Sequence, residues 1–131
     1  MLALPIYGQL SIDALSIDYT IDFSGFDGSG FTPSPAAGQL DSDTWAHSGM
    51  SDGALVFGGS GTSGDHARGS STGGVTTGGF YAFDRGAGNV CLGFQAAGSD
   101  FTPGTLTLRI QNNTGSTVTS FDISYNIAEY N

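Results

Sequence analysis

The sequence predicts an all-β protein whose architecture is a two-sheet β-sandwich or jelly roll. Apolar and polar residues alternate along several runs, as in strands that have one face on a core and one in water. The 131 residues include 22 glycines, one glutamate and no lysine, a composition that favours short strands and tight turns over helices. The most regular run lies near the C-terminus with no later segment to cover its edge. We therefore expect the sandwich to be incomplete without a following segment or a partner strand.

The N-terminal part contains one clear predicted strand. Residues 1–9 fit either the remnant of a signal peptide or an extra N-terminal strand, and we take residues 10–131 as the β-sandwich module. Residues 15–23 alternate between an apolar face and a face of serine, threonine and aspartate. Residues 25–38 contain two prolines, which predict a long irregular connection.

The middle of the chain predicts short strands separated by one long loop. Residues 59–79 consist mainly of glycine, serine and threonine, and a loop of this length in a compact domain is usually functional or disordered. Residues 84–89 have the composition of a hairpin turn. The strands predicted around these loops are residues 43–48, 53–58, 80–83 and 90–94.

The C-terminal part predicts a hairpin. Residues 104–111 place leucine or isoleucine at every second position, and residues 121–127 do the same with phenylalanine, isoleucine and tyrosine. Residues 112–117 between them have the asparagine, glycine and serine content of a turn. Both runs are therefore expected to be half-buried antiparallel strands.

The charge of the chain excludes some classes of partner. Twelve acidic residues against three arginines give a formal net charge of −9, which disfavours nucleic acid and anionic membranes. The sequence has no apolar run long enough to span a bilayer, so no membrane insertion is expected. Cys91 is the single cysteine, and we expect an inert thiol.

Two glycine motifs match enzyme signatures by letter alone. Residues 59–64 match G-x-G-x-x-G, and residues 69–73 match G-x-S-x-G around Ser71. Both signatures need a helix directly after the turn, and the sequence that follows is too rich in glycine and serine to form one. We therefore expect no catalytic residues and no enzymatic activity.

Alternating aspartates suggest a cation site. Asp41 and Asp43 could supply carboxylate oxygens to Ca²⁺ at the junction of a loop and a strand. The alternative is a solvated acidic turn that caps free backbone N–H groups. No other cofactor is predicted.

Aromatic residues and one arginine are the candidate ligand-binding residues. Trp45, Tyr81 and Tyr130 could each stack on the apolar face of a sugar, although such rings more often pack in a core. Arg68 is expected to pair with a nearby carboxylate. His47 and His66 are expected to be isolated, and a lone histidine is more often at the surface or hydrogen-bonded than a ligand.

Five stretches carry a resemblance to a known family. They are residues 38–45 (GQLDSDTW), 51–53 (SDG), 67–79 (ARGSSTGGVTTGG), 81–83 (YAF) and 99–104 (SDFTPG). They resemble an N-terminal β-rich module of large secreted multidomain proteins of the Bacteroidetes type, many of them exported by the type IX route. The chain departs from the family pattern at His66, where an aromatic residue is expected, and it ends where relatives continue through further strands. The resemblance implies a secreted or cell-surface location and implies no catalytic residues.

These observations lead to two functional hypotheses. The first is a secreted, non-catalytic binding or adhesion module that binds polysaccharide at the cell surface. The second is a structural subunit of an extracellular filament or surface layer, assembled by strand exchange between neighbouring protein subunits and hence a homo-oligomer.

Overall fold

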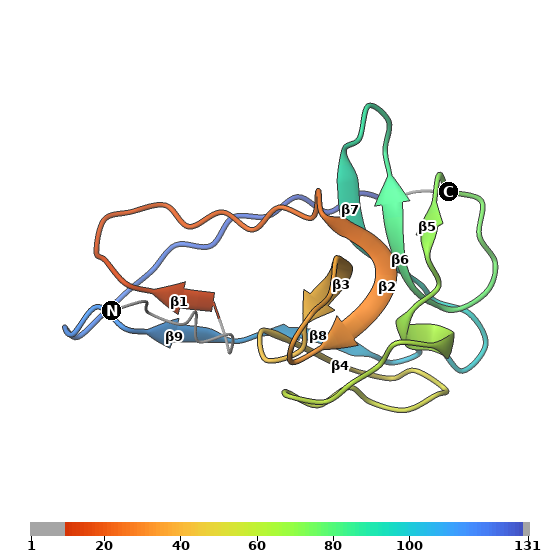
Figure 1. Ribbon diagram of the computed structural model, residues 1–131, viewed down its shortest axis with the longest axis horizontal. Coiled ribbons are helices and arrows are strands. Elements are labelled where there is room, and N and C mark those ends of the chain that lie inside the picture. Colours follow the sequence, from red (N-terminus) through yellow and green to blue (C-terminus); the bar gives the residue numbers. More distant parts are fainter. Residues whose placement is uncertain (1–9, 130–131) are drawn as a thin grey trace.

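The computed structural model describes residues 10–129, and this part of the chain is all-β (Figure 1). It is consistent with a β-sandwich-like fold of several small sheets, none of them closed within the described range. The predicted fold class is confirmed, whereas the two predictions for residues 1–9 lie outside the described residues. The strands are β1 (Leu10–Ile12), β2 (Phe26–Thr32), β3 (Gly38–Asp41), β4 (Trp45–Ser48), β5 (Ser70–Ser71), β6 (Gly79–Asp84), β7 (Val90–Gln95), β8 (Thr105–Leu108) and β9 (Ile110–Asn112).

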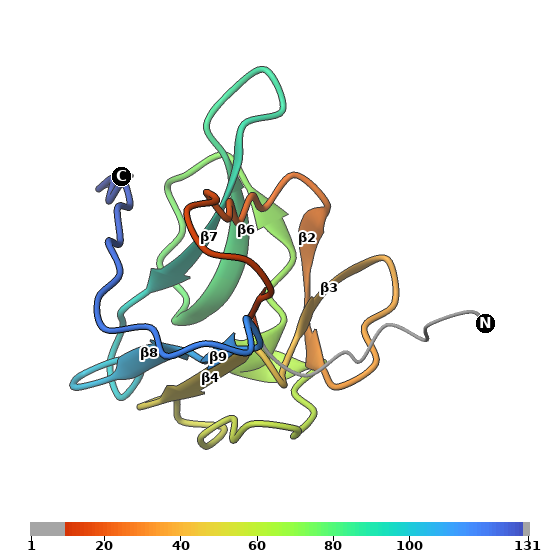
Figure 2. The ribbon, with the colours of Figure 1, turned by 90° about the vertical axis from the view of Figure 1, so that its left-hand side faces the viewer.

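The strands pair in four small sheets. One has the order β5-β6-β7, with β5 and β6 parallel and β6 and β7 antiparallel. The β4-β8 pair is antiparallel, whereas the β2-β3 and β1-β9 pairs are parallel. Figure 2 shows β4 and β8 below the β6-β7 hairpin, with β2 and β3 beside both. Helical structure within residues 10–129 is confined to the 3₁₀ turn η1 (Gly64–His66), and no helix there is long and apolar enough to cross a membrane.

The core lies between these sheets. Phe31 of β2 and Phe80 of β6 are fully buried, and their rings meet edge to face with centroids 5.4 Å apart. Leu106 and Leu108 of β8 are half-buried, whereas the threonines that alternate with them are exposed. The predicted alternation is therefore confirmed over β8, whereas Ile110, expected on the same face of one longer strand, lies in β9 and is 36% exposed. The other residues of the core cluster are Met50 and Leu55, with Leu40, Trp45, Leu92, Phe101 and Leu106 packed against it.

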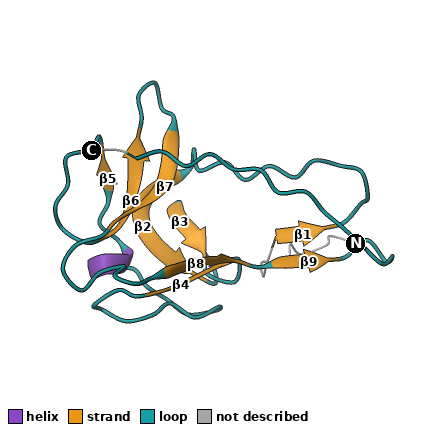
Figure 3. Ribbon diagram, turned by 180° about the vertical axis from the view of Figure 1, so that it is seen from behind, coloured by secondary structure: helices purple, strands orange, loops and turns teal. Residues whose placement is uncertain are grey.

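Two predicted strands are wrong. Residues 15–23 and 121–127 lie in no strand and are drawn as long loops in Figure 3. Six of the side chains expected on a core are instead in solvent: Leu15 is 54% exposed, Ile17 58%, Phe121 70%, Ile123 58%, Tyr125 75% and Ile127 83%. The remaining three, Tyr19, Ile21 and Phe23, are half-buried. An alternating sequence favours an extended backbone, but a strand also needs a neighbouring edge for hydrogen bonds. Neither segment has such a neighbour among the described residues.

Two further predictions need correction in the middle of the chain. Residues 53–58 form no strand, since Leu55 is buried through a single bridge to His47 while Val56 is exposed. Conversely, β2 lies in the stretch that was predicted to be irregular. Its Gly28 has a φ of +85°, and a Cβ atom there would lie 2.1 Å from the carbonyl oxygen of Gly69. Glycine at this position lets β2 approach the backbone of Gly69 closely, and it does not indicate a loop.

Candidate functional site

The buried carboxylate of Asp65 fixes the glycine-rich loop, which comprises residues 59–79. Asp65 is 2% exposed, and its Oδ2 atom accepts hydrogen bonds from the Ser51 hydroxyl at 2.8 Å and the Asp52 backbone N–H at 2.9 Å. The Asp52 carboxylate in turn accepts the backbone N–H of Asp65 at 2.9 Å. Burial alone would raise the pKa of Asp65. The hydrogen bonds from Ser51, Asp52 and Arg68 outweigh burial, so this pKa lies below its ordinary value.

Arg68 belongs to this anchor. Its guanidinium pairs with the Oδ1 atom of Asp65, so the predicted pairing with a carboxylate is confirmed. Its Nε atom also donates to the carbonyl oxygen of Gly78 at 2.8 Å. The two bonds connect Asp65 with Gly78, which is near the end of the glycine-rich loop. Arg68 is thus a structural residue in this arrangement, and its role as a ligand-binding residue remains a prediction.

The other aspartates of this region also bind backbone groups. Asp100 is 8% exposed and accepts the Ser51 backbone N–H at 2.8 Å. Asp41 accepts the Asp43 backbone N–H at 2.8 Å, and Asp43 lies 3.9 Å from the Arg109 guanidinium. Burial raises the pKa of Asp41. No group of three or more ligating side chains that could hold a metal ion occurs within residues 10–129, and calcium binding by Asp41 and Asp43 remains a prediction.

The two histidines form a pair, contrary to the expectation that they are isolated. The Nε2 atom of His47 lies 3.0 Å from the Nδ1 atom of His66. His47 is 3% exposed, and its ring packs on Phe80 with centroids 4.4 Å apart. Burial, followed by the charge of His66, lowers the pKa of His47 to about 4. The residues lie 19 positions apart in the sequence, and the bridge between His47 and Leu55 and the hydrogen bonds between Asp52 and Asp65 bring their segments together.

Of the two predicted aromatic platforms within residues 10–129, Tyr81 is buried and Trp45 is half-buried. Tyr81 is 6% exposed, its hydroxyl donates to the Thr77 carbonyl oxygen at 2.9 Å, and its ring stacks on Phe83. A buried ring cannot present a face to a sugar, so Tyr81 does not fit the predicted role. Trp45 is half-buried against the core and contacts Phe23 with ring centroids 5.9 Å apart. Tyr130 lies outside the described residues.

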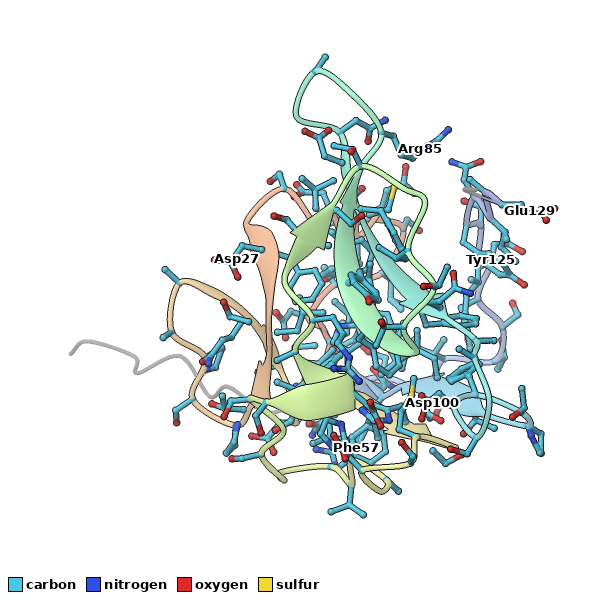
Figure 4. All side chains as sticks on the ribbon, turned by 90° about the vertical axis from the view of Figure 1, so that its right-hand side faces the viewer. Asp27, Phe57, Arg85, Asp100, Tyr125 and Glu129 are labelled. Atoms are coloured by element: carbon cyan, nitrogen blue, oxygen red, sulfur yellow. The ribbon has the colours of Figure 1, made fainter. Side chains whose placement is uncertain are left out.

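A polar groove runs across β2, β5 and β6. It has a volume of about 530 Å³, and Figure 4 shows Asp27 of β2 at the surface. Ser71, the residue of the G-x-S-x-G match, lies in this groove and exchanges hydrogen bonds with the backbone of Gly73 at 3.1 and 3.3 Å. The sequence did not predict the groove, because parallel pairing of β5 with β6 assembles it. Its lining residues are Phe26, Asp27, Ser70, Ser71, Thr72, Ala82, Asp84 and Val90.

The C-terminal part of the described chain is an extended, exposed segment. We call residues 117–129 the terminal segment, and within the described structure they make no backbone hydrogen bond. Figure 4 shows Tyr125 and Glu129 at the margin of the molecule, outside the sheets. Phe121, Ile123, Tyr125 and Ile127 occupy alternate positions, so a pairing partner would find one apolar and one polar face.

Comparisons with protein-family models, with curated proteins and with solved structures found no match.

Proposed function

We propose that this chain is a non-catalytic binding and adhesion module that contacts a protein partner by strand addition. The observation that carries the proposal is the terminal segment. Its apolar side chains are 58–83% exposed at alternate positions, and its backbone N–H and C=O groups form no backbone hydrogen bond with residues 10–129. Strand addition uses such groups for affinity and the alternate side chains for specificity.

The energetics favour a partner that covers the apolar face. Full burial of one large apolar side chain contributes roughly 1.5–3 kcal/mol, and the terminal segment offers four such side chains. Ordering the segment on binding offsets part of this gain. A partner must therefore bury several of the four side chains together, which an added strand on a supporting sheet would do.

Hydrogen exchange tests the proposal on the 131-residue chain. A panel of amphipathic strand-forming peptides of the length of the terminal segment should slow amide exchange at residues 119–127. Ile123→Asp should abolish this protection, whereas Ser124→Asp, on the polar face of the same segment, should retain it. Absence of protection with every peptide would contradict the proposal.

The polar groove supports a second function, polysaccharide binding. Asp27, which is exposed, provides acceptors for sugar hydroxyls, and the hydroxyl groups of residues 70–72 can donate or accept. Half-buried Val90 adds apolar surface at the same place. Such a mixture of apolar surface and convergent polar groups is typical of small-molecule sites.

Retention on affinity gels tests this second function. The chain should be delayed by at least one neutral polysaccharide, and Asp27→Asn should weaken the delay. Asp122→Asn removes the same charge outside the groove and should leave it unchanged. No retention on any gel, with or without calcium, would contradict polysaccharide binding while leaving strand addition untouched.

Secretion to the cell surface is part of the same proposal. The resemblance to β-rich modules of secreted Bacteroidetes-type proteins supports it, as does an acidic composition without lysine. Immunodetection of the chain on intact cells of its source would test the location, and a signal confined to lysed cells would contradict it.

A further inference from the structure

We propose that the partner of the terminal segment is the terminal segment of a second copy of this chain, paired antiparallel about Ser124. This inference rests on the proposed strand addition and names the partner and the register. The interface would be isologous, with a twofold axis through Ser124, which is the commonest symmetry of soluble oligomers.

The positions of the apolar side chains determine the register. Antiparallel pairing about Ser124 places Phe121 opposite Ile127 and Ile123 opposite Tyr125. Both are aromatic–β-branched pairs, which stabilise neighbouring strands. If one strand were displaced by one residue along the other, every pair would set an apolar side chain opposite a polar one. A centre at Ile123 leaves Ile127 opposite Thr119, and a centre at Tyr125 sets Phe121 against Glu129.

The charges of the segment agree with the same register. Asp122 and Glu129 are its acidic residues. Pairing about Ser124 places Asp122 opposite Asn126 and Glu129 opposite Thr119, so no two carboxylates face each other. A parallel in-register pair would set Asp122 against its own copy, and like charges directly opposite destabilise a pair of strands. This matters in a chain whose net charge of −9 already disfavours self-association.

The segment is accessible for such a contact. Figures 2 and 4 show it running along the outside of the molecule, and no backbone hydrogen bond of residues 117–129 would have to break within the described structure. An isolated two-stranded ribbon is only marginally stable in water. We therefore expect a reversible dimer whose population rises with protein concentration, and a covalent link at its centre should trap it.

Disulfide trapping tests the register. In the Cys91→Ala background, which removes the native thiol, Ser124→Cys places two thiols directly opposite each other on the twofold axis. Opposed Cβ atoms are about 4.5–5.5 Å apart, close to what a disulfide needs. Asn126→Cys is the matched control, because it lies on the same polar face but opposite Asp122. We expect the Ser124→Cys chain to form its dimer at least about tenfold faster than the control.

A mixture of two single-cysteine chains tests the direction of pairing. Asp122→Cys and Asn126→Cys chains should cross-link to each other faster than either links to itself. Equal rates for Ser124→Cys and Asn126→Cys, or preferential self-linking of the Asp122→Cys chain, would overturn the proposed register. If the peptides protect the segment but Ser124→Cys shows no preference, the second copy is not the partner and strand addition stands. If both experiments fail, both proposals fall.

Discussion

The Nε2 atom of buried His47 lies 3.0 Å from the Nδ1 atom of His66, and the Nδ1 atom of His47 has no hydrogen-bond partner within the described structure. A proton shared between the two rings can satisfy one nitrogen of His47 only. If the Nε2 atom of His47 donates, its bare Nδ1 atom is an unpaired acceptor. Protonation of His47 would instead leave a charged, unpaired N–H group in an apolar environment, which is costly.

Stability should therefore fall in mild acid. The folded pKa of His47, about 4, lies below its ordinary value of 6.5, so the unfolded chain takes up this proton first as the pH falls. Neutral His47 makes its full contribution to the free energy of unfolding above pH 6.5. This contribution, about 3 kcal/mol in total, is lost as the pH falls towards 4. Urea unfolding across this range measures it. His47→Gln should make the free energy of unfolding less dependent on pH. If the stability of this variant falls as steeply with pH as that of the unsubstituted chain, another group is responsible.

Removal of Arg68 should destabilise the fold. Arg68→Ala leaves the carboxylate of Asp65 buried without its cation, and breaking a buried pair typically costs about 3–5 kcal/mol. The partly exposed guanidinium lowers this expectation to about 2–3 kcal/mol. Chemical denaturation measures the change. Arg85→Ala, in the exposed turn between β6 and β7, is the control and should change stability by less than about 0.5 kcal/mol.

Alanine at Gly28 should be poorly tolerated. Gly28 combines a φ of +85° with a Cβ position 2.1 Å from the Gly69 carbonyl oxygen, so Gly28→Ala strains the backbone and separates β2 from the loop before β5. We expect a loss of at least about 2 kcal/mol. Gly25 has no atom within 4 Å of its Cβ position, and Gly25→Ala should be close to neutral. Thermal melts of the two variants compare them, and similar melting temperatures would contradict the packing of β2.

Calcium should raise the melting temperature if Asp41 and Asp43 bind the ion as predicted. Asp43→Asn would then reduce the shift, whereas Asp122→Asn, which removes the same charge in the terminal segment, would not. A calcium titration followed by calorimetry gives the readout. An unchanged melting temperature would leave Asp41 with the backbone role that its bond to Asp43 already shows.

The sequence predicted local structure better than pairing. Leu106 and Leu108 face the core as their spacing indicates, and the turn between β6 and β7 lies where it was expected. The same spacing at Phe121 and Ile123 predicted burial, yet both are exposed, because alternation specifies an extended chain and not the edge that it joins.

Site residues were harder to predict for a related reason. His47 and His66 meet only after β4 pairs with Leu55, and the polar groove exists only after β5 pairs with β6. No local sequence pattern predicts such long-range contacts. Arg68 was an exception, because in so acidic a chain a carboxylate partner was expected wherever the arginine lay.

The parallel pair of β1 with β9 joins Leu10 to Ile110 across nearly the whole described chain. Figure 1 shows this small sheet at the opposite end of the molecule from the β6-β7 hairpin. Closing so long a loop for three residue pairs costs much entropy and yields few contacts. Strands β1 and β9 should therefore pair only after the rest has folded, and they should separate first when the protein is stressed.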